Sequence, residues 1–119
     1  MGDLSAHFDR SEFACQCDCG YDTVDTVLLE ILEGVRQHFG APLTILSGCR
    51  CPKHNYDIGG SEKSQHKKGR AADFVVNEHL PIEVQNYLKT TYPDSLGIGS
   101  YKGFTHVDSR TRGGARWNG

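Results

Sequence analysis

Residues 64–76 read SQHKKGRAADFVV, in which a polar stretch with one glycine runs directly into an apolar one. The second half, AADFVV, has the length and composition of a short β-strand. The first half, SQHKKG, is typical of a loop. The sequence therefore predicts a strand over residues 71–76, with His66 in the preceding loop and Asp73 inside the strand.

A helix and another strand are predicted upstream of this segment. Residues 24–39, VDTVLLEILEGVRQHF, place apolar side chains at the spacing of one helix face. These side chains are Val24, Val27, Leu28, Ile31, Val35 and Phe39. Asp22 or Thr23 can cap the start of the helix, and Gly40 is placed for a left-handed C-terminal cap. Residues 42–46, PLTIL, then predict a short buried strand.

Two loops and a second helix are predicted around the central segment. Residues 47–50 and the stretch that ends at Gly59-Gly60 have the composition of loops. Pro81 suits the first turn of a helix that runs to about Tyr92. The residues expected to face inward from this helix are Val84, Tyr87 and Leu88.

The C-terminal third predicts a β-hairpin. The strand candidates LGIGSY, residues 96–101, and FTHVD, residues 104–108, are separated by Lys102-Gly103, which is typical of a turn. Helices packed on one side of a small antiparallel sheet give an α+β fold. No linker, internal repeat or low-complexity tract interrupts the sequence, so we expect a single domain over residues 1–119.

Composition narrows the class of protein. The chain is 37% hydrophobic and 24% charged, which is typical of a soluble globular domain. The net charge of −2 argues against general nucleic-acid binding. No apolar run approaches the about 20 residues that span a bilayer, so we expect no membrane insertion. Met1-Gly2-Asp3 opens a polar, acidic segment, so we expect a protein made in the cytoplasm without a signal peptide.

Charge is distributed unevenly along the chain. Residues 1–48 carry two basic and eight acidic side chains, whereas residues 49–119 carry eleven basic and seven acidic ones. The basic half would suit an anionic substrate, and the alternative is that the acidic half simply contains an exposed acidic helix.

Five cysteines lie in two tight groups, Cys15, Cys17 and Cys19 in the first and Cys49 and Cys51 in the second. An odd number without a signal peptide does not indicate a secreted disulfide framework. Cys-x-Cys pairs could hold a second, structural zinc ion, for which the candidate ligands are Cys17, Cys19, Cys49 and Cys51, although the usual spacing is longer. Free or redox-active thiols and a native disulfide are the alternatives.

Two histidines and one aspartate form a candidate metal site. His66 lies in the polar loop, Asp73 in the following strand and His106 in a strand near the C-terminus. Three such ligands from separate elements, with a fourth position left for water, are what catalytic zinc requires. Spacing alone does not establish the site, because single histidines are common on surfaces and in cores. We expect this ordinary role for the other four, His7, His38, His54 and His79.

The sequence around these residues resembles that of the M15 peptidases, which are zinc D-Ala-D-Ala carboxypeptidases and related cell-wall endopeptidases. Residues 64–73 resemble the family's S-x-H-x-x-G-x-A-x-D signature, and residues 47–50 its S-G-x-R segment. Further likenesses are Asn55 with Gly59-Gly60 (N-x-x-x-G-G), His106 with Asp108 (H-x-D), Arg116-Trp117, and an opening, residues 4–15, similar to small phage and prophage members. The resemblance implies the fold that these carboxypeptidases share with hedgehog domains.

Residue roles follow from this resemblance. It implies that zinc is bound by His66, Asp73 and His106, that Arg50 steadies the scissile carbonyl or its oxyanion, and that Ser64 helps to seat the peptide. A guanidinium in a pocket that excludes water is suited to stabilising the negative charge of an oxyanion. The alternatives are a surface salt bridge for Arg50 and a turn-forming hydroxyl for Ser64.

The general base is where the sequence departs from the family pattern. Many members place Glu or Asp three residues before the last histidine ligand, and that position is Gly103. Asp108 shares the strand face of His106, because residues two apart on a strand point the same way. Asp108 is therefore expected either to act as the general base or to orient a metal ligand without binding the metal itself. Glu62 and Glu78 are more distant candidates.

The resemblance implies a zinc-dependent peptidase that hydrolyses an amide bond in peptidoglycan stem peptides or cross-links. It would act at the bacterial cell wall as a phage lysin or as a virion component beside phage tail proteins. The alternative is a non-enzymatic zinc-stabilised module of the same fold, because hedgehog signalling domains share the fold and the metal site but have no known peptidase activity. A redox or metal-storage protein built on the cysteines would leave the His66–Asp73 signature unexplained.

Overall fold

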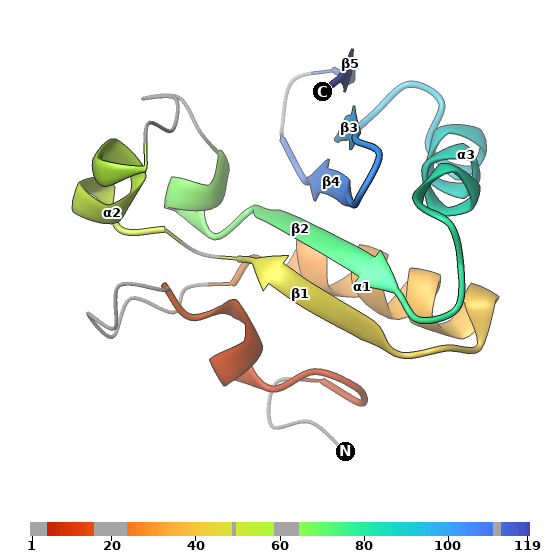
Figure 1. The fold of residues 1–119 in the computed structure, drawn as a ribbon, viewed down its shortest axis with the longest axis horizontal. Helices are drawn as coiled ribbons and strands as arrows, with labels where there is room; N and C mark the ends of the chain where they lie inside the picture. Colours follow the sequence, from red (N-terminus) through yellow and green to blue (C-terminus); the bar gives the residue numbers. More distant parts are fainter. Residues whose placement is uncertain (1–4, 16–23, 49, 59–64, 111–112) are drawn as a thin grey trace.

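The computed structural model describes residues 5–15, 24–48, 50–58, 65–110 and 113–119. In these residues, helices pack against one five-stranded sheet, which confirms the predicted α+β fold (Figure 1). The helices are α1 (Thr26–Phe39), α2 (Pro52–Asp57) and α3 (Pro81–Thr91), with short 3₁₀ helices η1 (Arg10–Phe13) and η2 (Gln65–Lys68). The strands are β1 (Leu43–Ser47), β2 (Ala71–Val76), β3 (Gly97–Ser100), β4 (Thr105–Asp108) and β5 (Ala115–Asn118). None of these helices is long and apolar enough to cross a membrane.

The sheet has the order β1-β2-β4-β3-β5. Neighbouring strands are antiparallel, including the predicted hairpin of β3 and β4, except that β5 pairs with β3 in parallel. The predicted antiparallel sheet is thus confirmed for β1 to β4, and the parallel strand β5 at its edge was not predicted. Residues 115–118, ARWN, carry no run of strand-forming residues. They adopt a strand conformation because they pair with β3.

Helix α1 confirms the predicted helix but begins later than Val24. Asp25 is its N-cap, and the Asp25 carboxylate accepts the backbone N–H of Leu28. The predicted caps Asp22 and Thr23 lie outside the described residues. Gly40 has φ 62° and caps the C-terminus in the left-handed conformation, as predicted. The buried face is Leu28, Ile31, Leu32 and Val35, whereas Val27 is 52% exposed, contrary to the prediction.

Between β1 and β2 the prediction of loops is wrong for residues 52–57, which form helix α2. A six-residue helix that begins with proline is too short to show helical periodicity, so its sequence resembles a loop. Helix α3 begins at Pro81 as predicted, and Val84 and Leu88 are buried. Tyr87 is only partly buried, and Gln85 is buried instead because its amide donates to the carbonyls of Tyr101 and Phe104.

The sheet has one apolar face and one polar face. Phe74 on β2, Val107 on β4 and Ile98 on β3 belong to one core cluster together with buried residues of α1 and α3. Successive side chains on a strand point to opposite faces. Asp73 and His106, which are cross-strand partners, therefore share the other face. The fold thus brings polar residues from separate elements to one place on the sheet.

Candidate metal centre

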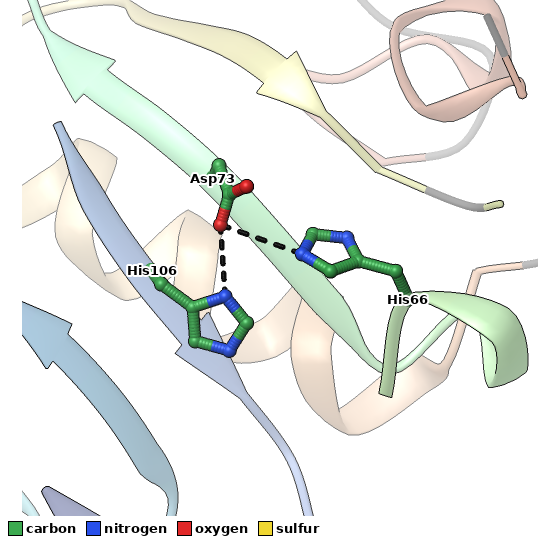
Figure 2. A group of neighbouring side chains, drawn as sticks. All are labelled: His66, Asp73 and His106. Atoms are coloured by element: carbon green, nitrogen blue, oxygen red, sulfur yellow. Dashed lines mark hydrogen bonds and ion pairs between the residues drawn. The ribbon is translucent and has the colours of Figure 1, made fainter. Parts of the chain in front are cut away.

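His66, Asp73 and His106 meet on the polar face of the sheet (Figure 2). Each offers one ligand atom, and these atoms all lie within 4.8 Å of one another. Asp73 Oδ1 is 3.4 Å from His66 Nε2 and 2.8 Å from His106 Nδ1. The predicted three-residue group is therefore assembled from η2, β2 and β4.

His66 is held by the backbone of the loop after β1. Its Nδ1 lies 2.7 Å from the carbonyl oxygen of Gly48, and the residue is 3% exposed. A carbonyl oxygen only accepts hydrogen bonds, so His66 Nδ1 carries the proton and donates it. The other nitrogen, Nε2, then faces Asp73 Oδ1.

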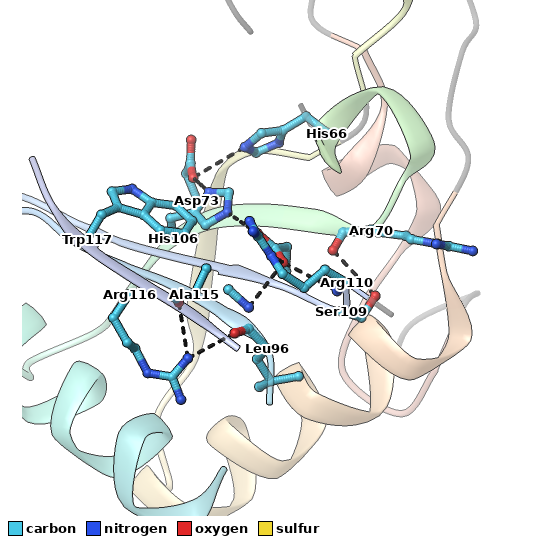
Figure 3. Close-up of polar contacts among 12 residues, drawn as sticks. His66, Arg70, Asp73, Leu96, His106, Ser109, Arg110, Ala115, Arg116 and Trp117 are labelled. Carbon is cyan, nitrogen blue, oxygen red and sulfur yellow. Dashed lines mark hydrogen bonds and ion pairs between the residues drawn. The ribbon is translucent and has the colours of Figure 1, made fainter. Parts of the chain in front are cut away.

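His106 is held from its far side by Asp108. His106 Nε2 is 2.8 Å from Asp108 Oδ2, and His106 Nδ1 faces Asp73 Oδ1 (Figure 3). The carboxylate of Asp108 accepts the Nε2 proton, which leaves Nδ1 as the nitrogen aimed at Asp73 and His66. In both histidines, therefore, one nitrogen is anchored by an oxygen and the other faces the group.

The ionisable side chains of the group change one another's pKa values. Burial alone would raise the pKa of Asp73, but hydrogen bonds from His106 and His66 and the charge of these two rings hold it well below its usual value. Burial alone would also raise the pKa of Asp108, but the hydrogen bonds and charges of Arg110 and His106 lower it. Burial would lower the pKa of His106, but Asp108 and Asp73 raise it. The site thus keeps both carboxylates ionised.

The donor set fits a divalent transition metal. Two imidazoles and one carboxylate suit zinc, and three protein ligands leave an open coordination position. Histidines that bind metals usually donate their second N–H to a carbonyl or a carboxylate. Gly48 and Asp108 supply those two acceptors for His66 and His106. The residues can therefore hold a metal without rearrangement of their outer hydrogen bonds.

The remaining histidines with described side chains have ordinary contacts. His7 pairs with Glu33, His79 pairs with Glu83, and the His38 ring stacks on Tyr87. These contacts agree with the expectation that such histidines occupy surface positions rather than a metal site. The side chain of His54 lies outside the described residues.

Arg50 lies at the edge of the group. Its Nη2 is 3.7 Å from Asp73 Oδ2, the carboxylate oxygen that faces away from the histidines. Its Nη1 donates to Asn55 Oδ1 at 3.3 Å and its Nε to Ser47 Oγ at 3.4 Å. The backbone N–H of Arg50 donates to the His66 carbonyl at 2.9 Å. The guanidinium is thus fixed beside Asp73, not extended into solvent.

Asp108 is fully buried, and donors occupy both of its carboxylate oxygens. Oδ1 accepts the backbone N–H of Gly97 and of Arg110 and the Arg110 Nε–H, and Oδ2 accepts from His106 and from Arg110 Nη2. A carboxylate has about four lone-pair positions. Asp108 therefore has little capacity left for a further proton-bearing group.

Arg110, Gly97 and Trp117 are site residues that the sequence reasoning missed. The ring of Trp117 lies 5.0 Å from that of His106, measured between centroids. Arg110 follows Asp108 by two residues, and this spacing alone does not indicate a bidentate ion pair. The Arg116-Trp117 likeness was the one sequence signal for the tryptophan.

Several predicted residues fall outside the described part of the chain. These are Ser64, Glu62, Cys17, Cys19 and Cys49. The backbone N–H of Cys51 lies 3.4 Å from Cys15 Sγ. Cys15 of the first group therefore contacts Cys51 of the second, and Cys15 is absent from the candidate ligand set. The second, structural zinc ion stays a prediction.

Gly97→Ala is expected to destabilise the protein by about 1–3 kcal/mol, the usual cost of inserting a methyl group into a packed site. A Cβ at Gly97 would overlap the carboxylate of Asp108, which donors hold on every side. Gly103→Ala is the matched control, because a Cβ there meets nothing within 4 Å. Chemical denaturation of both variants checks this, and equal stability would contradict the packing described for Asp108.

The fold and this group together define an α+β domain with a candidate metal centre on its sheet. The sequence model of the peptidase M15 family matches residues 6–108, most of the chain, so the protein belongs to this family of peptidases. The match includes the three candidate ligands, Arg50 and Asp108 and ends before Arg110. No curated protein matches the chain.

Proposed function

We propose that the protein is a zinc peptidase that hydrolyses an amide bond in the stem peptides or cross-links of peptidoglycan. The observation that carries this proposal is the cluster of His66, Asp73 and His106, whose ligand atoms lie within 4.8 Å. Bound there, zinc would supply a Lewis acid that polarises the amide carbonyl and lowers the pKa of water.

Arg50 is proposed as the residue that stabilises negative charge on the carbonyl oxygen. Its guanidinium is held by Ser47 and Asn55 and lies beside Asp73. A donor fixed in advance near the reacting carbonyl stabilises charge that develops only in the transition state. Ser64 is proposed to help seat the peptide, on the strength of the signature alone.

Asp108 is proposed as a positioning residue and not as the general base. Its carboxylate binds the nitrogen of His106 that points away from Asp73, so it orients the ring. The base role needs an oxygen within hydrogen-bond reach of the reacting water. Five donors already approach the two oxygens of Asp108, which favours the first role.

Asp108→Asn is expected to weaken zinc affinity by about 10–100-fold, the usual cost of removing the outer partner of a histidine ligand. Activity should return when zinc is in excess, because the ligands themselves remain. Zinc titration and turnover at saturating zinc check this. Normal zinc affinity with a 10²–10⁴-fold loss of turnover would instead identify Asp108 as the base.

The peptidoglycan substrate rests on the likeness of residues 64–73 to the cell-wall M15 peptidases. The basic excess of residues 49–119 would suit the anionic wall. We propose that the protein acts at the bacterial cell wall, as a phage lysin or as a virion component beside tail proteins. The likeness of residues 4–15 to small phage members supports this setting.

The test is incubation of the purified protein with defined muropeptides and zinc, followed by mass spectrometry of the fragments. Cleavage at one peptide position that chelation abolishes supports the proposal and identifies the bond. A wild-type protein that binds zinc and cleaves no muropeptide would favour the second candidate, a non-enzymatic zinc-stabilised module. That candidate is favoured by Gly103, which stands where many M15 members place a catalytic carboxylate.

Removal of zinc by a chelator is expected to lower the melting temperature by several degrees. A ligand bound only by the folded state stabilises it by about 2.7 kcal/mol when present at 100 times its dissociation constant. Thermal unfolding with and without chelator checks this. The chelator should leave the melting temperature of His66→Ala unchanged, and an identical wild-type melt would show that the ion adds no stability.

A further inference from the structure

Arg110 makes the most extensive side-chain contacts with Asp108. Its Nε donates to Asp108 Oδ1 at 2.7 Å and its Nη2 to Asp108 Oδ2 at 2.8 Å, so the planar guanidinium grips both oxygens. This bidentate geometry is specific to arginine and fixes the plane of the carboxylate. Asp108 cannot rotate about its side-chain bonds without breaking one of these bonds.

The orientation of Asp108 determines the orientation of His106. The oxygen that accepts from Arg110 Nη2, Oδ2, also accepts from His106 Nε2 at 2.8 Å. The opposite nitrogen of the same ring, Nδ1, lies 2.8 Å from Asp73 Oδ1. A turn of the carboxylate would therefore turn the imidazole and move Nδ1 out of the candidate metal centre.

Arg110 also contacts the ring of Trp117. The guanidinium carbon of Arg110 lies 5.4 Å from the centroid of the Trp117 ring, within the range of a cation–π contact. The same indole lies beside His106 (Figure 3). The guanidinium is thus fixed by a carboxylate and an aromatic ring, and its side chain is 28% exposed.

We propose that Arg110 is a positioning residue of the metal centre: through Asp108 it fixes the His106 ring with Nδ1 toward the metal. The inference rests on the proposed function to the extent that the group binds zinc. It differs from the role of an ordinary surface ion pair, which would contribute about 0–1 kcal/mol to stability and nothing to metal affinity.

The experiment measures zinc affinity by competition with a chromophoric chelator, together with the melting temperature of the metal-free protein. The variants are Arg110→Met, Arg110→Lys, Asp108→Asn and the double variant Asp108→Asn/Arg110→Met. Arg116→Met is the matched control, because Arg116 is also an arginine of the C-terminal segment but binds the carbonyls of Tyr92 and Leu96. Loss of that contact should lower the melting temperature and leave zinc affinity unchanged.

Arg110→Met is expected to weaken zinc affinity about 10-fold or more, within the range for outer partners of metal ligands. Arg110→Lys should recover part of the loss, since lysine keeps the charge but not the bidentate grip. In the Asp108→Asn background the Arg110→Met effect should shrink, because the residue that transmits it has changed. The absorption spectrum of bound Co²⁺ should change in Arg110→Met and stay the same in Arg116→Met.

Unchanged zinc affinity in Arg110→Met would overturn the inference. An equal loss in the wild-type and Asp108→Asn backgrounds would overturn it as well, since Arg110 would then not act through Asp108. Where Arg110→Met does not fold, Arg110→Lys decides, and wild-type affinity in that variant counts against the bidentate role. A wild-type protein that binds no zinc at this group contradicts the proposed function instead, which separates the two failures.

Discussion

His66→Ala is expected to lose the zinc ion of the centre and with it all measurable peptidase activity. The group has three candidate ligands, whose donor atoms lie within 4.8 Å of one another. Loss of an outer partner alone costs about 10–100-fold in affinity, so loss of a direct ligand should cost more than about 100-fold. Metal analysis after dialysis checks this, and unchanged zinc content would contradict the assignment.

The control for this prediction is another histidine of the same chain. His38 stacks on Tyr87 and is exposed, so His38→Ala should keep full zinc content. The cysteines need a separate control. If they bind a second ion, the wild-type protein would approach two zinc ions per chain, and Cys51→Ser would remove only one. His66→Ala should then retain the ion that Cys51→Ser loses.

Local sequence determined the central elements of the fold but not its edges. β2 has the bounds that its apolar run predicts, residues 71–76, and Ala72, Phe74 and Val76 on one of its faces belong to the core. β5 was missed since its four residues gain their conformation from β3, more than a dozen residues away. α2 was read as a loop since six residues do not display a helical period.

The candidate ligands could be identified because a short signature carries two of them. His66 and Asp73 lie seven residues apart, and η2 turns the chain so that both reach one side of β2. The support around them could not be predicted. The bond from Gly97 to Asp108 depends on the register of β3 on β4, and the grip of Arg110 depends on a side-chain orientation. Sequence spacing specifies neither.

Arg50→Met is expected to lower kcat by about 10²–10³-fold, the usual cost of removing one donor that stabilises an oxyanion. Zinc content and melting temperature should stay close to wild type, because none of the three candidate ligands is removed. Arg50→Lys should recover only part of the activity, since a single ammonium cannot reproduce the contacts to Asn55 and Ser47. Turnover of the cleaved muropeptide at saturating zinc is the measurement.

Arg36→Met is the control for this variant, because Arg36 lies in the last turn of α1, which packs against the other face of the sheet. Two results would contradict the role of Arg50. Wild-type kcat would show that no transition-state contact was lost. A loss of zinc that accompanies the loss of activity, and its recovery in excess zinc, would show that Arg50 acts on Asp73, 3.7 Å away. In that case the guanidinium orders a metal ligand, and the oxyanion is stabilised by another group.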